Sequence, residues 1–365
     1  MNDEYILENY LKQGVEGIVK DALKATLKNP RQSIFMARYA VSSKNANKLR
    51  DEAHERGEHV PPFLIASITS KCNLHCSGCY SRSNKSCTDN IAVDQLSDRD
   101  WLRIFNEAKE LGIGFIILAG GEPLMRPDVI KSAAGVQEIL FPIFTNGTML
   151  DDEYMNLISK SCNLIPVLSI EGNEQITDSR RGIGVYEKLM VVMDKLKESK
   201  IIYGASVTVT SENIYDVTGE EFLDKLSSRG CKAVFYVEYV PVDSETSQLA
   251  PQENERELLS RKLLELRLKY DDMLFIWFPG DEKEAGGCLA AGRGFFHINS
   301  HGGAEPCPFS PYSDTDLRKV SLKEALASPL FKKLQHSSIL TEEHKGGCVL
   351  FEKEETVQQL MSLNN

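Results

Sequence analysis

Residues 61–80 read PPFLIASITSKCNLHCSGCY, an apolar run followed at once by three cysteines. The run, residues 63–69, has the length and the apolar composition of a buried β-strand. Cys72, Cys76 and Cys79 come within the next ten residues, separated by three residues and then by two. In barrels of alternating strands and helices, function sits at the carboxyl ends of the strands, so this loop is a candidate site.

The pattern that begins with this strand repeats along the chain. Apolar runs alternate with helical segments, several of which end in glycine, the residue that favours a helix C-terminus. The predicted strands are residues 63–69, 115–119, 140–145, 164–170, 203–210 and 233–240. Strands that alternate with helices pair in parallel through right-handed crossovers. The sequence therefore predicts an α/β fold, a partial (β/α)6 barrel.

Other elements flank the predicted barrel on both sides. Residues 4–28 and 33–55 have helical spacing of apolar residues, and we expect them to pack on the barrel; a docking surface for a partner is the alternative. Past residue 245 a polar linker leads into a helix, residues 252–270, and then into a hairpin within residues 287–309. The predicted parts are an N-terminal helical extension (1–60), the barrel (61–245) and a small C-terminal α+β domain (246–365).

Composition narrows the classes of function. The 365 residues carry a net charge of −11, which repels nucleic acid, so no nucleic-acid partner is expected. No apolar window is long enough for a membrane span and the first residues do not resemble a signal peptide, so we expect a cytoplasmic protein. Nine cysteines in a reducing compartment indicate metal binding or burial rather than disulfides.

The three-cysteine loop suits an iron–sulfur cluster. Four irons need four ligands, so three thiolates leave one iron open. The alternative is a structural zinc ion, which needs four closed ligands and would have to recruit His75.

Four stretches together resemble the radical SAM superfamily. The spacing C-x3-C-x2-C after a first strand is its loop, and GGEP at residues 120–123 is similar to its motif for the methionine amino group of S-adenosylmethionine. LSIEGNEQITDSRRG (168–182) resembles a stretch of the subgroup that carries a C-terminal auxiliary-cluster domain, and VTVTSEN (207–213) resembles the segment beside adenine. Here Glu171 stands where that subgroup usually has Asp, and Gly78 stands in an aromatic position.

The resemblance implies a [4Fe-4S] cluster on Cys72, Cys76 and Cys79, whose open iron binds S-adenosylmethionine. No catalytic residue is assigned by it. The implied cofactor-binding residues are Gly120 and Gly121 for close backbone approach, Glu122 for the ammonium group, Pro123 for a stiff turn, Ser169 and Glu171 for the ribose, Arg181 for the carboxylate, Asn213 for the adenine, and Tyr80 after the third cysteine.

Cys288, Cys307 and Cys348 flank the hairpin and the C-terminal helix, a spacing that resembles the Twitch domain, a relative of the SPASM domain. This resemblance implies one auxiliary iron–sulfur cluster; burial as apolar cysteines is the alternative. Its fourth ligand is left open between substrate and one of His297, His301 and Cys231. Among the other cysteines, Cys162 and Cys231 are expected in the core, and Cys87 is expected to be an exposed thiol or without a role.

The expected function is reductive cleavage of S-adenosylmethionine to a 5′-deoxyadenosyl radical that abstracts hydrogen from a substrate. The expected outcome is oxidation or cross-linking of a peptide or protein. Alternatives are a dehydrogenase or rearrangement enzyme acting on a small molecule or cofactor precursor, and a non-catalytic iron–sulfur electron-transfer module. A reducing partner such as flavodoxin or ferredoxin is expected to supply the electron.

Overall fold

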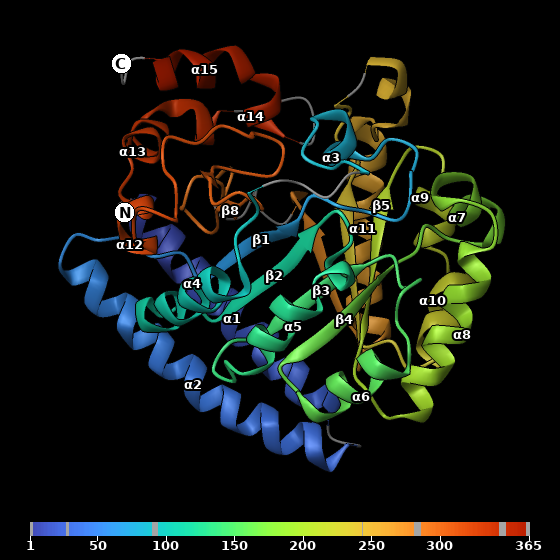
Figure 1. Cartoon of the computed structure of the whole chain (residues 1–365). Helices are drawn as coiled ribbons and strands as arrows, with labels where there is room; N and C mark the ends of the chain where they lie inside the picture. The colour runs from blue at the N-terminus through green and yellow to red at the C-terminus, as the bar shows by residue number, and fades with distance from the viewer. Residues whose placement is uncertain are drawn as a thin grey trace.

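The computed structural model describes residues 3–26, 29–89, 94–242, 244–280, 286–342 and 348–362. Seven parallel strands form its centre, in the order β7-β6-β5-β4-β3-β2-β1, with helices outside them (Figure 1). The strands at the six predicted places are β1 (Phe63–Thr69), β2 (Phe115–Gly120), β3 (Phe141–Thr145), β4 (Leu164–Ser169), β5 (Gly204–Val209) and β6 (Ala233–Glu238). The crossover helices are α4 (Asp98–Leu111), α5 (Pro127–Ala134), α6 (Asp152–Lys160), α8 (Val185–Glu198) and α10 (Glu220–Ser228). The predicted α/β partial barrel is therefore confirmed.

A seventh parallel strand, β7 (Leu274–Phe278), was not predicted. It pairs with β6, with Leu274 opposite Ala233, and α11 (Glu253–Lys269) supplies the crossover. The polar stretch near residue 245, which includes the short helix η2 (Ser244–Leu249), is thus part of one more βαβ unit. The predicted count of six was one strand short because that stretch was interpreted as a domain linker.

Aromatic contacts between distant strands show that the sheet is curved. Phe144 of β3 packs on Phe235 of β6 with 5.2 Å between ring centroids, although β4 and β5 lie between those strands. Phe295 contacts both Phe63 of β1, at 5.2 Å, and Phe278 of β7, at 5.4 Å. Because the first and the last parallel strands meet the same ring, these residues mark the concave face of a partial barrel.

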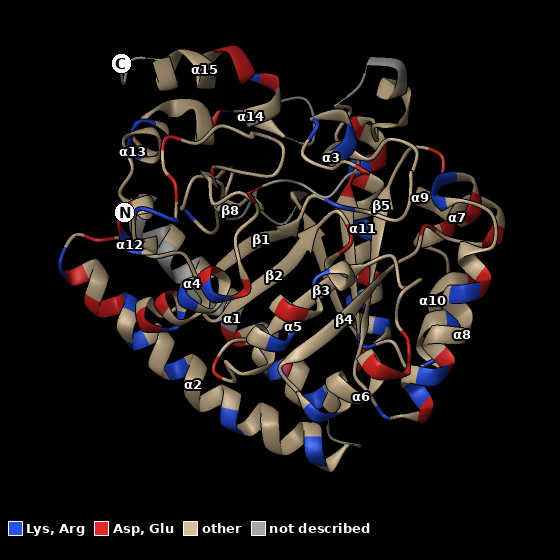
Figure 2. Ribbon diagram, viewed as in Figure 1, with Lys and Arg blue, Asp and Glu red and all other residues tan. Residues whose placement is uncertain are grey.

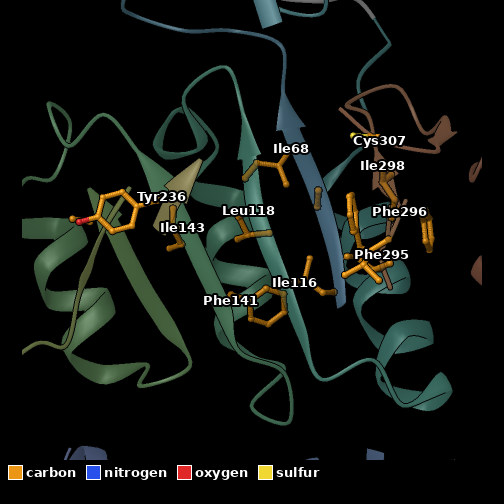
Figure 3. Close-up of a cluster of buried hydrophobic side chains, with 14 of the residues drawn as sticks. Ile68, Ile116, Leu118, Phe141, Ile143, Tyr236, Phe295, Phe296, Ile298 and Cys307 are labelled. Atoms are coloured by element: carbon orange, nitrogen blue, oxygen red, sulfur yellow. The ribbon is translucent and has the colours of Figure 1, made fainter. Parts of the chain in front are cut away.

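The opposite, convex face of β1 is packed under helices. Leu64 and Ile68 are fully buried in the same core as Trp101 of α4, and Figure 3 shows part of this layer. Side chains of a strand alternate between its two faces. Ser67 therefore faces the concave side together with Phe63.

The N-terminal helices pack on the barrel, as expected. α1 (Asp3–Thr26) and α2 (Pro30–Glu55) form a hairpin, and α2 runs along the outside of the sheet (Figure 1). The Tyr39 hydroxyl of α2 donates to the carbonyl of Gly114, just before β2, at 2.7 Å. Acidic and basic residues both occur along α2 (Figure 2). None of the described helices has an apolar stretch long enough to cross a bilayer.

The C-terminal segment continues the same sheet. The predicted hairpin is present as β8 (His297–Ile298) and β9 (Ala304–Glu305): β8 pairs in parallel with β1, and β9 pairs antiparallel with β8. The remaining helices of this segment are α12 (Leu322–Leu326), α13 (Pro329–His336), η4 (Ser338–Thr341), α14 (Val349–Glu352) and α15 (Glu354–Ser362). The domain boundaries at residues 60 and 245 stay predictions, and both β7 and β8 join the barrel sheet from beyond residue 245.

Candidate functional site

The cysteine loop lies at the carboxyl end of the parallel sheet, directly after β1. The Ser77 N–H donates to the carbonyl of Arg180, in α7 (Glu174–Arg181), at 2.8 Å. Gly78 has φ +64°, and a Cβ placed there would lie 2.6 Å from the Tyr239 hydroxyl oxygen. The aromatic residue usual at this position would not fit, because Tyr239 already fills that space.

The three thiols of the loop are half-buried and free. Nη1 of Arg181 lies 3.9 Å from Sγ of Cys76, while burial raises the pKa of the Cys76 thiol. A hydrogen bond from Cys87 lowers the pKa of Cys72. Because the thiolate is the form that binds metal, the hydrogen bond from Cys87 favours the metal-binding form of Cys72. The structure thus places Cys87, expected to be exposed or without a role, as a buried neighbour of the loop.

The donor set fits an iron–sulfur cluster better than a single ion. Within the described ranges no three His, Cys, Asp or Glu side chains converge tightly enough to hold one metal ion. His75, which a zinc site would need, is exposed, and its Nε2 lies 3.1 Å from the Asp89 carboxylate instead. In a four-iron cluster each cysteine binds a different iron, so the ligands surround the cluster rather than meeting at one point.

Gly120 and Gly121 bring the end of β2 against the backbone that leads into the cysteine loop. A Cβ on Gly120 would lie 2.3 Å from the Thr69 carbonyl oxygen, and one on Gly121 would lie 2.1 Å from the Lys71 carbonyl oxygen. The Gly121 N–H donates to Thr69 and the Glu122 N–H to Lys71, each at 2.8 Å. Close packing between the two strand ends is thus sufficient to explain why both positions are glycine. The predicted role of these glycines, close approach of the backbone to a ligand, stays a prediction.

The Glu122 side chain is buried and already bound within the protein. Its carboxylate accepts from the Thr145 hydroxyl at 2.6 Å, from the Asn146 N–H at 2.8 Å and from the Leu124 N–H at 3.1 Å. Burial raises the pKa of Glu122 to about 7. Pro123 begins the short helix η1 (Pro123–Met125), so GGEP forms a braced turn. A contact between Glu122 and the ammonium of S-adenosylmethionine stays a prediction.

Glu171 is the centre of a buried ion cluster. It is fully buried, pairs with Arg181 and lies 3.3 Å from Nε of Arg180. Its second oxygen accepts from the Thr208 N–H of β5 at 2.8 Å. In the structure Glu171 and Arg181 therefore bind each other, and their predicted contacts with ribose and carboxylate remain untested. Ser169 is half-buried on the concave face beside Ser206, a position open to a ligand.

Asn213 braces the loop after β5. Its side-chain oxygen accepts from the Thr210 N–H at 2.8 Å, and its side-chain nitrogen donates to the carbonyls of Thr208 at 2.9 Å and Glu171 at 3.1 Å. The amide is thereby used within the protein. The predicted contact with adenine stays a prediction.

Cys288, Cys307 and Cys348, far apart in the sequence, are brought together and buried. The thiols of Cys307 and Cys348 share a hydrogen bond, which lowers the pKa of Cys348, while burial raises the pKa of Cys307. Tyr80 connects this group with the loop: its ring packs 4.9 Å from that of Phe309, and its phenol pKa is raised by burial and by the charges of neighbouring cysteines, Cys307 among them. Cysteines of both groups therefore lie near Tyr80.

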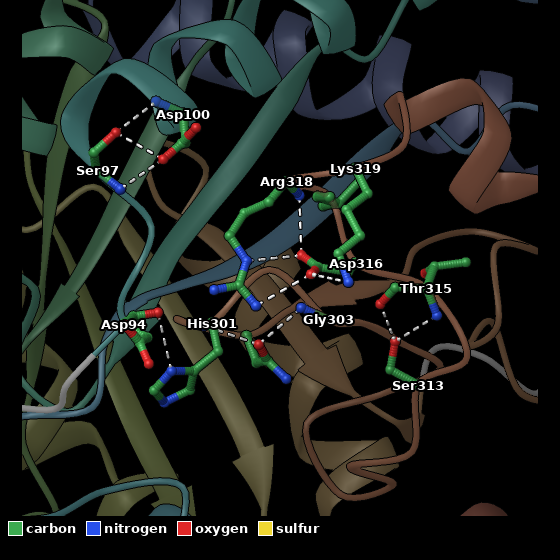
Figure 4. A network of polar contacts seen from close by, with 12 residues as sticks. Asp94, Ser97, Asp100, His301, Gly303, Ser313, Thr315, Asp316, Arg318 and Lys319 are labelled. Carbon is green, nitrogen blue, oxygen red and sulfur yellow. Dashed lines mark hydrogen bonds and ion pairs between the residues drawn. The ribbon is translucent and has the colours of Figure 1, made fainter.

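The three residues considered as a fourth ligand point elsewhere. Both ring nitrogens of His297 are hydrogen-bonded within the barrel wall. His301 is exposed, with Nδ1 3.4 Å from the carbonyl of Asp94 (Figure 4). Cys231 is buried before the amino end of β6, at the opposite edge of the sheet, and donates to Ala233. Its placement in the core is confirmed, whereas Cys162, also expected there, is half-exposed.

Sequence reasoning missed one polar group, formed by Ser67, His297 and Glu305. Ser67 Oγ lies 2.7 Å from Nε2 of His297, and Nδ1 of His297 lies 2.6 Å from the Glu305 carboxylate. The first two residues are 230 positions apart. No local motif could have revealed the group, because it depends on the pairing of β1 with β8.

A partial barrel with a three-cysteine loop at its mouth defines an iron–sulfur barrel protein. Residues 66–228 match the family model of the radical SAM superfamily, and this segment contains the cysteine loop, GGEP and Glu171. Residues 66–228 thus form a radical SAM domain, and the chain is a radical SAM enzyme. A [4Fe-4S] cluster and S-adenosylmethionine are the cofactors that this match implies.

Several characterised proteins are similar to the chain. It is 26% identical over 323 residues to the AdoMet-dependent heme synthase of Methanosarcina barkeri, covering 80% of this chain and 89% of that protein. It is 26% identical over 260 residues to the PqqA peptide cyclase of Rhizobium meliloti, covering 68% of each. The chain spans 60% of the sporulation killing factor maturation protein SkfB of Bacillus subtilis.

A solved structure supports the fold. Streptococcus suis SuiB, crystallised with its precursor peptide SuiA, superposes with a TM-score of 0.67 over 86% of this chain and 77% of that chain, at 18% identity. At this identity the superposition establishes a shared fold.

Proposed function

We propose that this radical SAM enzyme oxidises or cross-links a peptide or protein. The observation that carries the proposal is the half-buried loop of Cys72, Cys76 and Cys79, whose entrance is braced at the barrel mouth by the backbone N–H groups of Gly121 and Glu122. These cysteines would hold the [4Fe-4S] cluster. Once bound, the cluster and S-adenosylmethionine supply a 5′-deoxyadenosyl radical.

The second cysteine group is proposed to hold one auxiliary iron–sulfur cluster. The convergence of Cys288, Cys307 and Cys348 from three separate segments supports this. Three buried thiols with one shared hydrogen bond are more than apolar packing requires. Since His297, His301 and Cys231 are turned away, we propose that the fourth position is left for the substrate or for another ligand.

The names of the relatives support a peptide substrate. PqqA peptide cyclase and SkfB, a maturation protein, are similar over 68% of this chain. A flavodoxin or ferredoxin is proposed as the electron donor and the cytoplasm as the location. The match to the radical SAM family model argues against the non-catalytic electron-transfer alternative.

A second candidate substrate is a porphyrin. The heme synthase match covers 89% of that protein, the largest share among the relatives described above. A second relative is named Fe-coproporphyrin III synthase, of which the chain spans 44%. A porphyrin is a cofactor precursor, so this candidate corresponds to the alternative of an enzyme that acts on a cofactor precursor.

Anaerobic reconstitution tests the cofactor assignment. Wild-type protein should carry about eight irons per chain and form 5′-deoxyadenosine when reduced with S-adenosylmethionine. Changing Cys72, Cys76 and Cys79 to Ala should abolish cleavage and leave about half of the iron. The half-exposed Cys162 offers a matched control, since Cys162→Ala should change neither result. Cleavage retained by the triple variant would contradict the assignment.

Deuterium transfer into 5′-deoxyadenosine then separates the substrate classes. The enzyme is incubated with S-adenosylmethionine, reductant and either the peptide fraction of cells grown in deuterated medium or deuterated Fe-coproporphyrin III. Transfer from the peptide fraction alone supports the first proposal. Transfer from the porphyrin alone supports the second and overturns the first.

A further inference from the structure

Ser67, His297 and Glu305 form a continuous hydrogen-bonded chain where β1, β8 and β9 meet. All three are buried, with exposed fractions of 8%, 4% and 5%. The two bonds measure 2.7 Å, from Ser67 Oγ to Nε2, and 2.6 Å, from Nδ1 to Glu305 Oε2. Asn299 donates to the other carboxylate oxygen at 2.5 Å, which fixes the carboxylate in position.

The chemistry of the three groups sets the direction of these bonds. An ionised carboxylate only accepts, so Nδ1 of His297 carries the hydrogen that Glu305 receives. Nε2 is then an acceptor, and the Ser67 hydroxyl donates to it. A hydroxyl, an imidazole and a carboxylate linked in this order are the arrangement by which serine hydrolases withdraw a proton from the hydroxyl. Nothing else in the proposed function uses this group.

The Ser67 end of the chain faces the interior of the barrel. β1 side chains alternate, and Phe63, on the same face as Ser67, contacts Phe295 across the concave side. Thr69 ends β1 two residues later, and Cys72 follows three residues after that. The hydroxyl therefore lies on the inner wall just below the loop proposed to hold the cluster.

The position of Ser67 favours proton transfer over acyl transfer. Ser67 lies inside β1, paired with Ala119 of β2 and next to the residues that pair with β8, where backbone N–H groups serve the sheet. Acyl transfer also needs N–H donors aimed at a developing oxyanion. A serine on a strand offers a hydroxyl to the interior without that environment.

We propose that Ser67, His297 and Glu305 form an acid–base site for the substrate. Resting on the proposed function, the site acts after hydrogen abstraction: the substrate radical gives a proton to the Ser67 oxygen as Ser67 gives its own to Nε2 of His297. The remaining electron leaves to an oxidised iron–sulfur cluster, so the substrate loses one proton and one electron in this step. Glu305 is a positioning residue that stabilises the imidazolium.

A thiol in place of the hydroxyl tests whether the group at residue 67 gives its proton to His297, without needing the substrate or oxyanion donors. In Ser67→Cys, iodoacetamide reacts with the thiolate: a C–S bond forms, the C–I bond breaks, iodide leaves and the thiol proton passes to Nε2 of His297. The full chain is labelled before and after reconstitution, and the modified residue is identified by mass spectrometry. We expect alkylation at residue 67, slowed about 100-fold or more when His297→Gln is added and slowed when Glu305→Gln is added.

His301→Gln is the matched control, because His301 lies in the turn of the same hairpin but is exposed. Added to Ser67→Cys, it should leave the alkylation rate unchanged. Absence of alkylation at residue 67, or equal rates with and without His297→Gln, would overturn the proposal.

A reference within the same molecule covers the case in which His297→Gln fails to fold. The thiol of Ser67→Cys should be alkylated by iodoacetamide faster than the partly buried Cys162 thiol, and adding His297→Asn should remove that advantage. Alkylation no faster than at Cys162 would also overturn the proposal. Because labelling needs no cofactor, failure of this site is distinguishable from failure of cofactor cleavage.

Discussion

Replacing Gly121 with alanine should displace the entrance to the cysteine loop. The added Cβ would lie 2.1 Å from the Lys71 carbonyl oxygen, 2.4 Å from its carbon and 3.0 Å from the Cys72 nitrogen. Ordinary contact begins at 3.4 Å, so the two backbones must separate by about 1.3 Å, the difference between 3.4 and 2.1. All three neighbours are backbone atoms, so no side-chain rotation can relieve the contact.

Two consequences follow from that displacement. Overpacking of this kind lowers the free energy of unfolding by about 1–3 kcal/mol. The shift also moves Cys72 relative to Cys76 and Cys79, and a misplacement of about 1 Å lowers a rate about 100-fold. Urea unfolding measures the first effect, and formation of 5′-deoxyadenosine by reconstituted protein measures the second.

Gly14→Ala provides the control for the same chemical change. No atom lies within 4 Å of a Cβ at Gly14, in the exposed part of α1, so stability should be unchanged or slightly raised. If Gly121→Ala unfolds at the wild-type urea concentration and cleaves S-adenosylmethionine within twofold of wild type, the packing argument is wrong.

Three further outcomes are expected. Burial raises the pKa of Glu122 from 4.5 to about 7, so the protonated Glu122 stabilises the folded protein fully below pH 4.5, and this stabilisation is lost as the pH rises through 7. In urea unfolding, the difference between wild type and Glu122→Gln in free energy of unfolding should therefore change by about 3 kcal/mol between pH 4 and pH 8. Glu171→Gln leaves two partly buried arginines uncompensated and should lower the free energy of unfolding by about 3 kcal/mol, measured by the same method. Changing Cys288, Cys307 and Cys348 to Ala should reduce the iron content to about four per chain, measured by iron analysis, and full iron would contradict the auxiliary cluster.

The strand order of the barrel could be predicted because it depends on local signals. Each of β1 to β6 is a short apolar run between helical segments, and consecutive parallel strands lie side by side in the sheet. β7 has the same character but follows a polar stretch that is typical of a linker. The placement of β8 beside β1 depends on residues more than 200 positions apart, which no local pattern encodes.

The positions of the candidate site residues at the strand ends could be predicted, but the partners of their side chains could not. Cys72, Gly121 and Glu171 follow the carboxyl ends of β1, β2 and β4, which lie along the same edge of the sheet. The binding of Glu171 to Arg181 and Thr208 depends on which way each side chain turns after its strand ends. The motif identifies the carboxylate of Glu171 but does not indicate which donors it binds.

The pairing of β8 with β1 links all three groups of chemically active residues. β1 carries Ser67 and leads into Cys72, whereas β9 ends at Glu305, two residues before Cys307. Because β8 joins these strands, its register fixes the distance between the two cysteine groups together with the bond from Ser67 to His297. A slip of one residue would turn His297 to the other face of the sheet and displace β9 with Cys307. The hairpin is therefore a structural part of the barrel wall, and its geometry couples the proposed acid–base site to both proposed cluster sites.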